Sequence, residues 1–95
     1  MLFNEIGSFS GGIIDSEYQT KLNEQPYRQS VADIVSSWGR EECLEFFDSL
    51  EPGQIEDRYS NLDSNSLSID NMRKVVCLVV WDWGWEGSDW FINNH

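Results

Sequence analysis

The sequence contains few of the residues on which enzymes depend. Among its 95 residues there is one histidine, His95, at the last position, and two cysteines that form no C-x-x-C pair. A Ser-His-Asp or Cys-His constellation therefore has no base in the body of the chain. The glycines of "SGGII" (10–14) lack the lysine and the spacing of a phosphate-binding loop. We expect no enzymatic activity and no cofactor.

Long apolar runs and basic residues near the start are also missing. The longest apolar run, residues 75–81, is far shorter than the roughly 20 residues of a membrane-spanning helix. The first fourteen residues contain no base, which is not typical of a signal peptide. Cys43 and Cys77 lie among apolar neighbours, which favours buried, reduced thiols, with a disulfide between them as the open alternative. We expect a cytoplasmic protein.

Acidic and aromatic side chains are abundant. There are 17 acids against 6 bases, a net charge of -11, with 14% aromatic and 40% hydrophobic residues. That hydrophobic content is typical of a folded chain, and the length fits one domain over residues 1–95. The negative charge opposes direct binding to nucleic acid or to an anionic membrane. It favours a basic protein partner.

Apolar side chains recur at helical spacing in the middle of the chain. One set follows Pro26, a residue suited to a first helical turn, and a second set ends before the Pro-Gly of "EPGQ" (51–54). The two sets are Val31, Ile34, Val35 and Trp38, then Cys43, Phe46, Phe47 and Leu50. They predict two helices, with Val31, Ile34, Trp38, Phe46 and Phe47 buried.

Signals elsewhere are weaker. We expect Gly11-Gly12 to interrupt the first segment and Ser16 to cap a helix that follows. A short helix is plausible from about 54 to 62, with Ile55, Tyr59 and Leu62 on one side. The composition of "DSNSLS" (63–68) is typical of a loop.

The apolar run "VVCLVVWDW" (75–83) fits either a helix or a strand. A helix would be capped by Ser68 or Asp70, would end at a left-handed Gly84, and would place Trp85 against Val80. Its apolar face would hold Met72, Val76, Val79 and Trp83. A strand would instead point Val79, Trp81, Trp83 and Trp85 to one side. We predict a mainly helical domain of four to five short helices, the alternative being an α+β fold with a strand at 75–83.

Negative charge is concentrated between residues 41 and 70, where nine acids accompany one base. Concentrated charge of one sign is typical of a surface that steers a charged partner, and aromatic side chains supply interface anchors. Trp90 and Phe91, near the end of the chain, are expected to be exposed. The predicted partner-binding residues are Glu41, Glu42, Glu45, Asp48, Glu51, Glu56, Asp57, Trp90 and Phe91.

Two segments, "REECLEFFDSLEPGQIED" (40–57) and "WDWGWEGSDW" (81–90), carry a resemblance to a known class. They resemble the acidic, aromatic-bearing surfaces of small immunity proteins that bacteria carry beside secreted nuclease toxins, including those of contact-dependent growth inhibition systems. The resemblance implies a cytoplasmic protein that neutralises a basic toxin by occluding its nucleic-acid-binding or active site. It implies no role for any single residue.

Three other functions remain as alternatives. Phage-encoded inhibitors that mimic DNA share the same acidic character. A carboxylate-metal hydrolase is a second alternative, although "DWGWEGSD" (82–89) lacks the D-x-D-x-D-G order of a calcium loop, so we expect no metal site. A structural subunit held by hydrophobic contacts is the third, and its complexes would be indifferent to salt.

Overall fold

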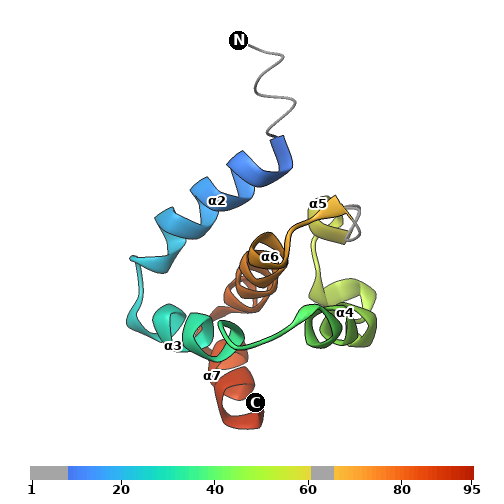
Figure 1. The fold of residues 1–95 in the computed structure, drawn as a ribbon. Helices are drawn as coiled ribbons and strands as arrows, with labels where there is room; N and C mark the ends of the chain where they lie inside the picture. The colour runs from blue at the N-terminus through green and yellow to red at the C-terminus, as the bar shows by residue number, and fades with distance from the viewer. Residues whose placement is uncertain (1–8, 61–65) are drawn as a thin grey trace.

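The computed structural model describes residues 9–60 and 66–95, which form five helices of ten residues or more (Figure 1). These are α2 (Phe9–Leu22), α3 (Pro26–Val35), α4 (Arg40–Ser49), α6 (Ile69–Asp82) and α7 (Gly84–Asn94). Two short elements lie between α4 and α6 in the chain, the 3-10 turn η1 (Pro52–Gln54) and the single helical turn α5 (Asp57–Ser60). The described ranges contain no strand. The predicted helical fold is confirmed, and the alternative with a strand at 75–83 is wrong because residues 75–82 lie within α6.

Helix α6 lies at the centre, with α2, α3, α4 and α7 packed around it (Figure 1). Residues 75–81 are all buried, so this part of α6 is covered on every side rather than on the single face expected. Trp81 is buried among its neighbours, whereas Trp83 is only half-buried. The predicted cap is confirmed, because the Ser68 hydroxyl accepts a hydrogen bond from the Asn71 N–H at 3.1 Å.

The end of α6 leads directly into α7, a helix that the sequence did not predict. Gly84 has a φ of 85°, so the expected left-handed glycine is confirmed. Trp85 does not fold back on Val80 as expected; it is 60% exposed in the first turn of α7. Instead the buried Ser88 hydroxyl donates to the Val80 carbonyl at 3.2 Å. This bond holds α7 against the end of α6.

The two helices predicted in the middle of the chain are confirmed as α3 and α4. Pro26 occupies the first turn of α3, and Val31 and Phe46 are buried as expected. Ile34, Phe47 and Trp38 are only partly buried, and Trp38 lies beyond the end of α3. The Trp38 ring therefore sits at the edge of the core, where it contacts both Phe46 and Phe91.

The expectations for the weaker elements were wrong in part. Gly11-Gly12 does not interrupt the chain but lies inside α2, and Ser16 is an exposed residue of that helix rather than its cap. Packing of α2 on α6, including a 5.3 Å stack of Tyr18 on Trp81, outweighs the poor helix propensity of glycine. The short helix expected at about 54–62 is confirmed only in part: α5 begins at Asp57, and Gln54 belongs to η1. Leu62 and the first half of the predicted loop, residues 63–65, lie outside the described residues.

Candidate binding surface on α4 and α7

Helix α4 carries the acidic side chains of the candidate site. Glu41, Glu42, Glu45 and Asp48 are all exposed. The Gly39 N–H donates to Glu42 Oε1 at 2.8 Å, so the Glu42 carboxylate satisfies one free N–H at the start of the helix. Glu41, Glu45 and Asp48 form no ion pair with any described residue. Their charges are therefore available to a partner.

The side chains of three arginines are bonded mainly to backbone carbonyls. Arg73 Nε donates to the Trp38 carbonyl at 2.8 Å, and Arg40 Nη2 donates to the Leu67 carbonyl at 3.0 Å. Arg28 Nη1 donates to the Lys21 carbonyl at 2.9 Å and pairs with Glu24 at 2.7 Å. These bonds hold the helices together, and none of them is made to a carboxylate of α4.

Lys74 on α6 is the remaining base with a described ion pair. Its Nζ lies 2.6 Å from Asp15 on α2 and 2.9 Å from Asp70 on its own helix. The hydrogen bond to Asp15 raises the pKa of Lys74. The pair fastens α2 to α6, on elements other than α4.

A hollow of about 560 Å³, here called the α4–α7 hollow, separates α4 from the C-terminal part of the chain. Its floor is aromatic, with the Phe46 ring centroid 5.9 Å from those of Trp38 and Trp83. The Trp83 indole N–H donates to the Gln54 carbonyl at 2.6 Å, which fixes that ring in place. The residues that line the hollow are Trp38, Glu42, Glu45, Phe46, Ser49, Leu50, Gln54, Trp83, Trp90 and His95.

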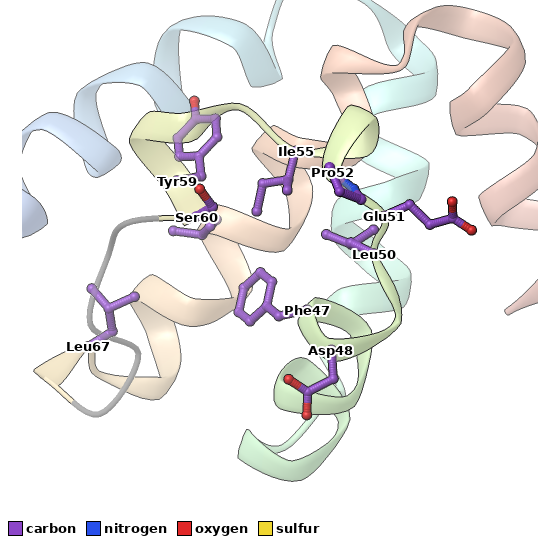
Figure 2. A pocket seen from close by; sticks show the side chains of 10 residues that line it. Phe47, Asp48, Leu50, Glu51, Pro52, Ile55, Tyr59, Ser60 and Leu67 are labelled. Carbon is purple, nitrogen blue, oxygen red and sulfur yellow. The ribbon is translucent and has the colours of Figure 1, made fainter.

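A second hollow of about 340 Å³, the α4–α5 hollow, lies near the C-terminal end of α4 (Figure 2). Figure 2 shows Phe47 among the apolar side chains of Leu67 and Ile55, with the Glu51 carboxylate turned away from them. The lining residues are Phe47, Asp48, Leu50, Glu51, Pro52, Ile55, Tyr59, Ser60, Leu67 and Val75. Leu50 lines both hollows, so the C-terminal end of α4 forms a ridge between them.

The structure brings together five of the nine predicted binding residues around these hollows. Glu42, Glu45 and Trp90 line the α4–α7 hollow, where Trp90 is 56% exposed as predicted. Asp48 and Glu51 line the α4–α5 hollow. The exposed residues Glu41, Glu56 and Asp57 line neither hollow.

The expected exposure of Phe91 is wrong. Phe91 has no exposed surface, and its ring centroid lies 5.7 Å from that of Trp38 and 6.0 Å from that of Phe46. One residue along a helix is a rotation of about 100°, so Trp90 and Phe91 point in different directions once α7 forms. His95, the last residue, stacks on Phe91 at 4.5 Å and lines the α4–α7 hollow.

The aromatic floor of the α4–α7 hollow was not predicted as part of a site. Helical spacing identified Trp38, Phe46 and Trp83, but only as core residues. Each is partly or largely covered, and each lines the hollow. A signal in the sequence that could have indicated an aromatic site is the clustering of four tryptophans within residues 81–90.

Other chemistry within the described residues is limited. Cys43 and Cys77 are buried free thiols, and burial raises the pKa of both, that of Cys77 to about 12. Protonated thiols are poor nucleophiles and poor metal ligands. Between 9 and 60 and between 66 and 95, no three His, Cys, Asp or Glu side chains are placed to hold a metal ion. No helix in these ranges has the length and apolar character needed to cross a membrane.

Comparison with known proteins gives limited overlap. No family model and no solved structure matches the chain. A Saccharomyces cerevisiae protein named as a putative aryl-alcohol dehydrogenase is 30% identical over 81 residues, which are 83% of this chain and 22% of that protein. The chain thus spans about a fifth of the length of this relative. A match of that extent shows no shared family.

Proposed function

We propose that the protein binds and inhibits a basic protein in the cytoplasm, and that this partner is a nuclease toxin. One observation supports the proposal: exposed carboxylates of α4 and the exposed Trp90 of α7 line the same hollow. A nuclease needs a positively charged groove to hold phosphates. The carboxylates of α4 would take the place of those phosphates, and Trp90 would supply a desolvated anchor.

The distribution of charge is consistent with steering of such a partner. The net charge is -11, and Arg28, Arg40, Arg73 and Lys74 are engaged by the protein's own carbonyls and carboxylates. A concentrated field of one sign accelerates the encounter with an oppositely charged surface. A phage-type inhibitor of a DNA-binding defence protein would use the same surface, so the identity of the partner distinguishes these two functions.

The proposal is tested with the product of the reading frame next to this gene. We expect that product to be a basic nuclease whose cleavage of nucleic acid stops at equimolar amounts of this protein. Stopped-flow measurements should show an association rate that falls steeply with ionic strength, while dissociation changes less. A partner without nuclease activity would contradict the toxin assignment, and association rates that stay flat across salt would contradict steering.

A matched pair of variants locates the surface. Glu45→Gln removes one exposed charge from α4, and Asp33→Asn removes one exposed charge from α3, away from both hollows. The amide introduced by Asp33→Asn retains an oxygen able to accept the 3.1 Å hydrogen bond from Gln29. Glu45→Gln should weaken inhibition about fivefold, the effect of roughly 1 kcal/mol, and Asp33→Asn should leave it nearly unchanged. Equal losses would place the binding surface elsewhere.

A further inference from the structure

We propose that the α4–α7 hollow holds an arginine side chain of the basic partner, with its guanidinium against the tryptophans and between the carboxylates of α4. This inference rests on the proposed function, because it names the group of the partner that the hollow accepts. Three observations support it: the hollow has an aromatic floor, carboxylates lie at its rim, and no described lysine or arginine lines it.

The aromatic lining provides flat surfaces for a cation. Trp83 is half-buried and held by its indole N–H bond to the Gln54 carbonyl, while Trp90 stands 56% exposed at the rim. Cations are attracted to the faces of indole rings, and the planar guanidinium can also stack on them. A fixed ring and an exposed ring in one hollow therefore favour arginine over an uncharged side chain.

The rim provides the opposite charge. Glu42 and Glu45 both line the hollow from α4 and are exposed. Glu42 accepts the Gly39 N–H through Oε1, which restrains the carboxylate while leaving its second oxygen with no described bond. A guanidinium has five N–H donors in a fork that matches carboxylate oxygens, whereas an ammonium is a more strongly hydrated point charge.

No lysine or arginine among the described residues lines this hollow. The lining set contains two glutamates and His95 as its titratable groups. Arg73, which reaches toward one of the lining residues, is bonded to the backbone carbonyl of Trp38. A guanidinium that enters the hollow therefore meets carboxylates that are not already neutralised by a base of the lining.

The probe that tests this is N-acetyl-arginine methylamide, compared with the citrulline analogue, which has nearly the same shape and no charge. In nitrogen-15 NMR spectra of the intact protein, the arginine probe should shift the indole N–H signals of Trp83 and Trp90 and leave that of Trp85 in place. The citrulline probe should bind at least about tenfold more weakly. Equal binding of the two probes, or arginine shifts confined to Trp85, would overturn the inference.

Variants provide matched controls for the same titration. Trp90→Ala and Trp85→Ala each remove an exposed tryptophan from α7, and only Trp90 lines the hollow. Trp90→Ala and Glu45→Gln should each weaken binding of the arginine probe about fivefold to tenfold, while Trp85→Ala and Asp33→Asn should leave it unchanged. If the control variants lose as much binding of the arginine probe as Trp90→Ala and Glu45→Gln do, the assignment of the hollow is contradicted.

The two proposals can fail separately. If the arginine probe binds in the hollow but no basic nuclease is inhibited, the hollow is an arginine site and the proposed function is wrong. If a nuclease is inhibited and the probe gives no shift at Trp83 or Trp90, the proposed function stands and the arginine site is wrong. The same titration with N-acetyl-lysine methylamide tests the preference for arginine. If this lysine probe binds as tightly as the arginine probe, recognition of the planar guanidinium is contradicted.

Discussion

Trp90 and Phe91 are adjacent in the sequence, yet the structure predicts a large loss of stability when Phe91 is replaced by alanine and almost none when Trp90 is. Phe91 has no exposed surface and contacts Trp38, Phe46 and His95 with its ring. Truncation of a buried phenylalanine costs about 3–5 kcal/mol. A small domain has a total stability of about 5–15 kcal/mol, and 1 kcal/mol shifts its Tm by about 4–8 °C. Phe91→Ala should therefore lower the Tm by at least about 12 °C.

Trp90→Ala should leave folding almost intact, because 56% of that residue is already in water. We expect a loss below about 1 kcal/mol, similar to that of the control Trp85→Ala, which removes a residue that is 60% exposed. Far-UV circular dichroism through heat and urea unfolding measures all three variants. If Trp90→Ala destabilises the protein as much as Phe91→Ala, or if Phe91→Ala has no effect, the packing of α7 described above is wrong.

Three further predictions concern stability. Gly87→Ala should lower the free energy of unfolding by about 1–3 kcal/mol, because an added Cβ would clash with the Trp83 Cβ. An unchanged urea midpoint would contradict this close approach. Burial raises the pKa of the Cys77 thiol to about 12, whereas in the unfolded chain the thiol loses its proton near pH 9. The free energy of unfolding should therefore be unaffected by this thiol below about pH 9 and should fall as the pH rises toward 12. Cys77→Ala should flatten that fall in urea unfolding measured against pH. Glu45→Gln should raise the Tm slightly, since like charges four residues apart, here with Glu41, cost about 0.2–0.5 kcal/mol; a clear fall in Tm would contradict this.

The helices that could be predicted from the sequence are those with local signals. Pro26 marks the start of α3, and Ser68 caps α6, where its hydroxyl bonds the Asn71 N–H. Helix α7 was missed because Gly84 marked the end of the preceding helix and no helix was predicted after it. Gly84 does supply the left-handed turn, but Gly87 is required by its closeness to Trp83, and burial of Ser88 supports the helix around it. Such contacts between elements leave no periodic signal.

The acidic side of the candidate site was predictable, and its shape was not. Charge counting located Glu42 and Glu45 on a helix, and both are exposed there. The α4–α7 hollow depends on how two helices pack against α6, with Trp83 held by a carbonyl 29 residues away. Sequence spacing within one helix carries no information about that distance. Phe91 could be assigned to the core only after α7 had been placed.

The described bonds of the few bases explain how the carboxylates of Glu41, Glu45 and Asp48 on α4 remain without an ion pair to a described residue. Arg40 and Arg73 are bonded to carbonyls of Leu67 and Trp38, and Lys74 joins α2 to α6. Positive charge is therefore used to connect helices, and the acids of α4 remain close to one another in water. Their mutual repulsion lowers the stability of the free protein. A basic partner relieves that repulsion when it binds, so the same carboxylates that destabilise the free protein would strengthen the complex and raise its apparent Tm.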